Sequence, residues 1–233
     1  MALGVSAICF AQPQSSATAR VVYTHVKPDM LDEWLDLQKN EVVPALKKGG
    51  TTTRLVYVTT LFGNSYEYVA VTPFAKYADF DSPNPLVKAL GEAGAARLQA
   101  KLRKCTESQT SYANTRLTDI SNVLDAPTDI IVTARYRIAP GKMPDFEALV
   151  KSDVLPVYKK AKVSLLVNRR GVGANPNDVT MVTGYSKMAG LDGGPFLTQQ
   201  LGADGVAKLN AKFTGIRTLI EVAVRRRVAD LSF

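Results

Sequence analysis

Histidine and cysteine are scarce in this sequence, which has one histidine and two cysteines among its 233 residues. A structural zinc site typically takes about four cysteine and histidine ligands, so these residues cannot build one. A haem bound through histidine would have only His25 to use. We therefore expect neither a metal nor a cofactor.

Long apolar runs and nucleotide-binding motifs are also missing. No stretch of about 18 or more apolar residues is present, which excludes a membrane-spanning helix. The sequence has neither a P-loop nor a G-x-S-x-G motif, and Gly171-Val172-Gly173 lacks the rest of a dinucleotide-binding fingerprint. We therefore set aside nucleotide-dependent enzymes and serine hydrolases.

Basic side chains outnumber acidic ones, and the net charge of +8 is uneven, because residues 122–233 carry +6 of it. This balance permits an acidic partner. The basic residues form no motif interleaved with aromatics and no long block beyond Arg225 to Arg227. The pattern therefore argues against nucleic acid as a partner.

Residues 1–19 carry no charge and contain a short apolar core followed by small residues, which is typical of an export signal. The basic residues that usually precede such a core are missing, so the true start of the chain stays open. A functioning signal predicts a periplasmic or secreted protein, and otherwise the protein is cytoplasmic. Removal of the signal would leave Cys105 as the last cysteine, with no intramolecular disulfide to form.

The second half of the chain repeats the first. At a spacing of 112 residues, Pro28, Val42 and Pro44 meet Pro140, Val154 and Pro156, and at 111 residues Leu90 and Gly91 meet Leu201 and Gly202. Solenoid repeats run from about 20 to 50 residues, so a period this long indicates two copies of one small domain. We assign residues 20–121 and 130–233 to the two domains and residues 122–129, with Pro127, to the linker.

Each copy shows the same order of elements, read from alternating and helical apolar patterns. A strand is followed by an amphipathic helix, a hairpin of two strands, a second helix and a closing strand. Pro44 and Pro156 lie late in the first helix, where proline kinks a helix or starts a new turn. The hairpins are predicted at 53–61 with 66–73 and at 163–170 with 179–185, the second helices at 84–104 and 196–213, and the closing strands at 108–117 and 218–228.

The order β-α-β-β-α-β is that of a ferredoxin-like domain, whose sheet has both helices on one face. Two such copies can cover each other's open sheet faces. The predicted fold class is therefore α+β, with two tandem ferredoxin-like domains packed as an intramolecular pseudo-dimeric α/β barrel.

Two segments carry a family resemblance: VKPDMLDEWLDLQKNEVVPALKK and IAPGKMPDFEALVKSDVLPVYKK. In each, a strand ends in proline and is followed by a turn and an acidic, aromatic helix that closes in V-x-P. The sequence resembles the dimeric α/β-barrel superfamily, which includes antibiotic-biosynthesis monooxygenases and NIPSNAP-type proteins, here as a fused tandem. The resemblance implies a cofactor-independent oxygenase or isomerase, although one fold serves many functions.

Strand alternation predicts which side chains share a face of the sheet. In the second copy we expect Ile130, Tyr136 and Ile138, with Ile220, Val222 and Val224 of the last strand, to lie under the helices. The opposite face should lie between the two sheets. Its polar residues are the candidate ligand-binding group: Tyr23, Tyr112, Asn114, Arg116, Arg135, Arg137, Glu221, Arg225 and Arg227.

This polar face supports two interpretations. It could form a cavity in which His25 acts as general base and the arginines hold a small anionic or aromatic ligand. It could instead be a structural layer in which Glu221 pairs with arginines. His25 has Arg137 as its counterpart, so the copies do not give two equivalent histidine sites.

Two functions therefore stay open. The first is a small-molecule-binding protein with oxygenase or isomerase activity. The alternative is a non-catalytic structural or interaction protein of the cell envelope. An apolar cavity between sheet and helices favours the first, whereas tight filling by Trp34 and Phe146 favours the second.

Overall fold

The computed structural model describes residues 17–59, 61–124 and 127–233. Nearly all of the predicted export signal and residues 125–126 of the predicted linker lie outside this range. Both halves have the element order predicted from the sequence. The first half contains β1 (Thr18–Val26), α1 (Leu31–Leu37), α2 (Val43–Lys48), β2 (Leu55–Thr59), β3 (Glu67–Pro73), α3 (Pro85–Cys105) and β4 (Thr106–Arg116). The second half contains β5 (Ile130–Ile138), α4 (Met143–Leu149), α5 (Leu155–Ala161), β6 (Leu165–Arg170), β7 (Asp178–Tyr185), α6 (Phe196–Lys212) and β8 (Arg217–Arg227).

The helices are interrupted where proline and glycine stand. A wider π-type turn joins α1 to α2 and α4 to α5, and Pro44 and Pro156 follow it as the second residues of α2 and α5. Proline has no N–H to donate and its ring needs extra room, which the wider turn supplies. Gly91 in α3 and its counterpart Gly202 in α6 have φ of 69° and 70°, a conformation that glycine adopts at little cost.

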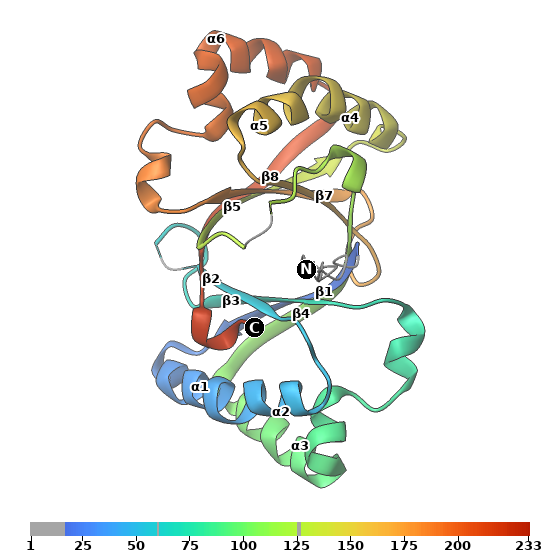
Figure 1. Ribbon diagram of the computed structural model, residues 1–233, viewed down its shortest axis with the longest axis vertical. Helices are drawn as coiled ribbons and strands as arrows, with labels where there is room; N and C mark the ends of the chain where they lie inside the picture. Colours follow the sequence, from blue (N-terminus) through green and yellow to red (C-terminus); the bar gives the residue numbers. More distant parts are fainter. Residues whose placement is uncertain (1–16, 60, 125–126) are drawn as a thin grey trace, which may run out of the picture.

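The strands form one closed barrel in the order β1-β3-β2-β8-β5-β7-β6-β4 (Figure 1). Every neighbouring pair is antiparallel. The halves meet at two junctions, β2 with β8 and β4 with β6, each with three paired residues on a strand. The predicted pseudo-dimeric α/β barrel is confirmed. Because the halves join through their edge strands, the barrel has no unpaired edge strand.

Two helical layers cover opposite sides of the barrel, α1 to α3 on one and α4 to α6 on the other (Figure 1). Trp34 packs against Tyr68 in the core of the first half, and Phe146 is fully buried in the core of the second. The aromatic residues therefore fill equivalent layers. Among the described residues, no helix is both long and apolar enough to cross a membrane.

The halves exchange a hydrophobic anchor. Ile120, in the short turn after β4, is buried in the core of the second half, and Leu231, in the equivalent turn after β8, is buried in the core of the first. The C-terminal residue continues this contact, since Phe233 and Arg54 exchange two backbone hydrogen bonds of 2.8 and 2.7 Å. Each core is therefore completed by the other half of the chain.

One expectation about the outer faces is wrong. Ile220 and Val222 of β8 were predicted to lie under the helices, but they are 43% and 52% exposed. β8 is the last strand of its half in the sheet, and the second core is built on side chains from β5, β6 and β7. The helices therefore do not reach the outer face of β8.

Candidate functional site

The inner face of the barrel carries all ten residues singled out from the sequence. Alternate residues of β1 and β5, such as Val26 and Ile138, belong to the helix-covered cores, so their neighbours His25 and Arg137 point the other way. Pairing places β4 and β8 residues on the same face, as with Arg135 opposite Glu221. The lining includes Tyr23, His25, Tyr112, Asn114, Arg116, Arg135, Arg137, Glu221, Arg225 and Arg227.

A chain of alternating charges runs along this inner face. Arg137 donates to Asp178 through Nε and Nη2, and Arg135 lies 3.5 Å from the same carboxylate. Arg135 also contacts Glu221 at 3.3 Å. Arg225 lies 3.7 Å from Glu221 and donates to Glu67 at 2.7 Å. Three arginines thus pair with three carboxylates, with Arg137 at one end of the chain and Glu67 at the other.

Arg225 is the most deeply buried member, at 2% exposure. It donates to Thr133 and lies 5.5 Å from the ring centre of Tyr23. Its Nε atom has no hydrogen-bond partner among the described residues, and the same holds for Nε of Arg135. These buried donors keep unused hydrogen-bonding capacity on the inner face, which water inside a barrel commonly satisfies.

Two tyrosines and an arginine form a second group. Tyr112 donates to the Tyr23 hydroxyl at 3.5 Å, and Arg170 lies 4.4 Å from the ring centre of Tyr112. Burial, with Tyr23 nearby, raises the pKa of Tyr112 well above its usual range, so its hydroxyl stays protonated and can donate. No carboxylate lies within ion-pair distance of Arg170 in the described part of the chain.

The other predicted residues lie outside the chain of paired charges that runs from Arg137 to Glu67. His25 faces Glu107, with 3.4 Å between Nε2 and Oε2, at the end of β1. Arg227 pairs with the exposed Asp129 at 2.9 Å. Asn114 and Arg116 lie at the β4–β6 junction, opposite Arg170 and Asn168. Arg137 and Arg227 share the inner face with Glu221 but do not pair with it, because they pair with Asp178 and Asp129 instead.

Three charged residues of this face were missed from the sequence: Glu67, Asp178 and Arg170. All three lie in the hairpin strands, whereas the sequence argument used the first and last strands of each copy. The same alternation was available, because Asp178 alternates with the buried Val179 and Arg170 follows two residues after Asn168. Extending the pattern to the hairpins would have found the missing carboxylates.

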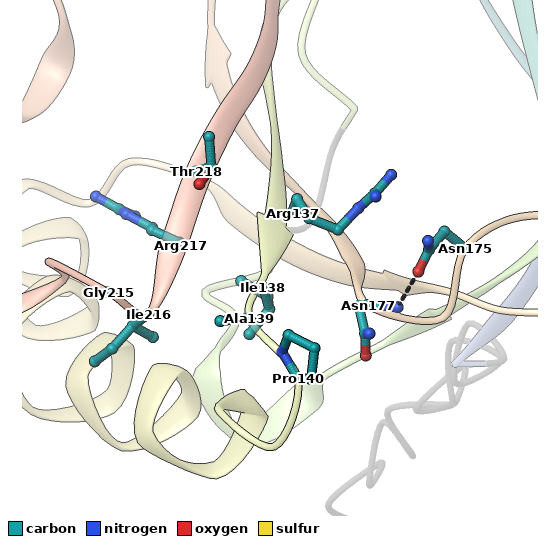
Figure 2. A pocket seen from close by; sticks show the side chains of 10 residues that line it. All are labelled: Arg137, Ile138, Ala139, Pro140, Asn175, Asn177, Gly215, Ile216, Arg217 and Thr218. Atoms are coloured by element: carbon teal, nitrogen blue, oxygen red, sulfur yellow. Dashed lines mark hydrogen bonds between the residues drawn. The ribbon is translucent and has the colours of Figure 1, made fainter.

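An open pocket of about 410 Å³ lies at the end of this charge chain, beside Arg137 (Figure 2). It forms where β5 ends, between the turn that leads to β8 and the hairpin loop between β6 and β7. Pro140 and Ile216 supply apolar side chains next to the buried Ile138, and Arg137 is the one predicted site residue in the lining. The full lining is Arg137, Ile138, Ala139, Pro140, Asn175, Asn177, Gly215, Ile216, Arg217 and Thr218.

The same backbone arrangement recurs in the first half with larger side chains. Ala139 N donates to Ile216 O at 2.9 Å, and Lys27 N donates to Cys105 O at the same distance. Ile138 N donates to Asn177 O at 2.8 Å, and Val26 N donates to Tyr66 O at 3.1 Å. Lysine thus stands in place of Ala139, and tyrosine in place of Asn177. The second half therefore carries smaller side chains at these two positions of the pocket lining.

No group of three or more His, Cys, Asp or Glu side chains that could hold a metal ion occurs in the described ranges. Between sheet and helices, Trp34 and Phe146 are only 3% and 0% exposed. By the criterion set from the sequence, this tight filling favours the non-catalytic alternative, so a ligand site has to lie elsewhere, as the pocket beside Arg137 does.

The chain is similar to known proteins in structure and not in sequence. No family model matches the sequence, and no curated protein does. A "putative monooxygenase" from Lactobacillus acidophilus is similar in structure, with a TM-score of 0.59 and 10% identity over 93% of this chain and 97% of that one. A "putative monooxygenase" from Fusobacterium nucleatum has a TM-score of 0.59 and 11% identity over 91% and 93%.

A third similar structure is described as an anthrone oxidase-like protein, with a TM-score of 0.59 and 13% identity over 91% of this chain and 90% of that one. Identities this low show a common fold and leave activity undecided. The chain therefore has the fold of monooxygenase-like dimeric α/β-barrel proteins, as the sequence resemblance predicted, with both halves in one polypeptide.

Proposed function

We propose that the protein binds a small organic molecule in the pocket beside Arg137. The observation that carries the proposal is the pocket volume of about 410 Å³, which falls within the range of about 300 to 1,000 Å³ typical of small-molecule sites. The lining combines apolar residues with polar ones that could fix the orientation of a ligand.

Isoleucine methyl groups give a direct test. Ile138 and Ile216 line the pocket, whereas Ile220 lies on the exposed outer face of β8 and serves as internal control. A protein labelled at isoleucine δ1 methyls is titrated with small aromatic acids, amides and amines. We expect shifts at Ile138 and Ile216 and none at Ile220. If no compound shifts either pocket methyl, the pocket is not a ligand site.

A matched variant closes the pocket without a new backbone conformation. Ala139→Lys introduces the residue that the first half carries at the equivalent hydrogen-bonded position, Lys27. Binding should weaken about tenfold or more, because the long side chain occupies the lining, and Lys27→Ala should leave binding at Ile216 unchanged. Equal binding by Ala139→Lys and the wild type would contradict the proposal.

Oxygenase activity on the bound molecule is the finer form of this proposal, and the likeness in fold to monooxygenase-like structures supports it. It is tested by oxygen consumption with anthrone as probe substrate, in wild type and Ala139→Lys. Consumption that Ala139→Lys abolishes supports the oxygenase. If anthrone shifts the pocket methyl signals but no oxygen is consumed, the protein binds the compound without oxidising it.

The structural alternative rests on a specific observation, the balanced pairing of three inner arginines with three carboxylates. A fully paired layer of this kind holds strands in register and needs no ligand. It would be favoured if the methyl titrations showed no binding at all.

A further inference from the structure

The charges around the pocket point to the class of ligand. Among the ten lining residues two are arginines and none is acidic. The guanidinium of Arg217 lies 4.3 and 3.8 Å from the ring centres of Tyr136 and Phe213, on the helix-covered side, and Figure 2 shows its side chain directed away from Arg137. Arg137 is therefore the charged group that a bound molecule would meet.

Arg137 keeps donors available although it is paired. Its Nε and Nη2 atoms contact Asp178, while no hydrogen bond of Nη1 is found within the described ranges. The hydrogen bonds that Arg137 donates to Asp178 raise the pKa of Arg137 further above its usual value, so the guanidinium stays charged. Its side chain is 45% exposed, whereas that of Asp178 is 4% exposed. The guanidinium of Arg137 is thus accessible to solvent at the end of the barrel, whereas the carboxylate of Asp178 is not.

The position of Arg137 in the charge chain strengthens this asymmetry. Asp178 is shared between Arg137 and Arg135, so neither arginine has a carboxylate to itself. At the opposite end, the chain finishes with a carboxylate, Glu67, which is paired in register with His25. The end of the chain at the pocket is thus the basic one.

The uncharged polar groups of the pocket also favour a ligand that accepts hydrogen bonds. Asn175 Oδ1 accepts a hydrogen bond of 2.9 Å from Asn177 N (Figure 2). This bond uses the oxygen of the Asn175 amide and leaves its NH₂ group as a donor. The Thr218 hydroxyl adds a group that can donate or accept.

The rest of the lining is apolar. Pro140 and Ile216 have side chains without hydrogen-bonding atoms, and the buried Ile138, which is 1% exposed, packs in the core next to them. We infer that the ligand is an amphiphilic anion, with a carboxylate or sulfonate held by Arg137 and an apolar body of one or two rings lying on Pro140 and Ile216. The inference rests on the proposed binding function.

Three indole compounds test it, because they share one apolar body and differ in charge: indole-3-acetate, the neutral indole-3-acetamide and the cationic tryptamine. Each is titrated against the Ile138 and Ile216 methyls of the full chain. We expect indole-3-acetate to bind about tenfold tighter than indole-3-acetamide, because a hydrogen bond between two charged groups is stronger than one from Arg137 to a neutral amide. Tryptamine should bind weakest.

The variant Arg137→Gln tests whether the preference for the anionic compound comes from Arg137. It should reduce the preference for indole-3-acetate over indole-3-acetamide to about twofold or less while indole-3-acetamide binds as before, because the apolar lining is retained. Asp178 keeps Arg135 as a partner, and Arg137→Lys, which keeps the charge, should preserve most of the preference if the fold is intact. A variant with Leu219, Ile220 and Val222 of β8 changed to Ser, Gln and Ser should bind all three compounds as the wild type does.

The outcomes separate the two proposals. If none of the indoles shifts a pocket methyl, binding itself fails. If all three bind with equal affinity, or if Arg137→Gln leaves the preference unchanged, the protein binds small molecules but the anionic class is wrong.

Discussion

The two halves share a backbone and differ in the charges they place inside the barrel. Tyr23 and His25 of β1 have Arg135 and Arg137 as their counterparts in β5, and Asn114 of β4 has Arg225 in β8. The helix-covered cores stay apolar in both halves. The apolar pattern under the helices therefore suffices for the fold, while the inner face was able to diverge between the copies.

The junctions show this divergence most closely. Each junction contains two inner arginines. Arg227 of β8 and Arg116 of β4 occupy equivalent positions, but the second arginine comes from opposite partners, because Arg225 of β8 stands opposite Thr59 of β2 whereas Arg170 of β6 stands opposite Asn114 of β4. Thr59 Oγ1 and Asn114 Oδ1 are both buried without a hydrogen-bond partner among the described residues. The two junctions therefore share one arginine position and differ in the other.

The largest expected effect comes from removing Arg225, the inner arginine of the β2–β8 junction whose counterpart in β4 is Asn114. Arg225→Asn introduces the residue of the equivalent position 114 and leaves Glu67, whose side chain is 14% exposed, without its cation. We expect a loss of about 3 kcal/mol in the free energy of unfolding, as for other broken buried pairs. Urea unfolding followed by circular dichroism measures it.

A double variant serves as control. Adding Glu67→Gln to Arg225→Asn removes the stranded charge and should recover part of the loss. A cost below about 1 kcal/mol for Arg225→Asn would show that Glu67 is solvated and that the pair contributes little.

The exchanged anchors test whether the halves are separable. Ile120 lies in the core of the second half and Leu231 in that of the first. Because both side chains are buried, Ile120→Ala and Leu231→Ala should each lower the free energy of unfolding by about 2 to 4 kcal/mol. The single tryptophan, Trp34, reports on the first half alone. We expect Ile120→Ala to lower the urea midpoint of Trp34 fluorescence as much as that of circular dichroism.

Independent halves would behave differently. Trp34 fluorescence would then keep its wild-type midpoint in Ile120→Ala and shift only in Leu231→Ala. That result would mean that the anchors add stability without coupling the two cores.

Much of the architecture could be predicted because the duplication supplies two readings of each element. Trp34 and Phe146 mark the same helix in both copies, and alternation along β1 and β5 indicates which side chains point inward. The partners inside the barrel were harder to predict, because Arg225 meets Glu67 across a junction between halves, and no local pattern encodes that pairing. The pocket was missed because its lining includes small residues such as Ala139 and Gly215, whereas a motif search looks for residues with reactive side chains.

The smallest expected effect concerns the outer face of β8, where sequence reasoning failed. Leu219, Ile220 and Val222 are exposed, and the equivalent residues of β4 are Ser108, Gln109 and Ser111. Changing the three to Ser, Gln and Ser should cost less than about 1 kcal/mol in unfolding free energy, because little apolar area leaves a packed core.

A buried valine provides the contrast. Val167→Ser, at 0% exposure in β6, should cost more than about 2 kcal/mol, since it leaves a cavity and buries a hydroxyl. If the triple change on β8 cost as much as Val167→Ser, its apolar side chains would contribute to stability in spite of their exposure. If it costs little, the apolar outer face of β8 is a property of the second copy that folding does not require, since the first copy forms the same strand with polar residues.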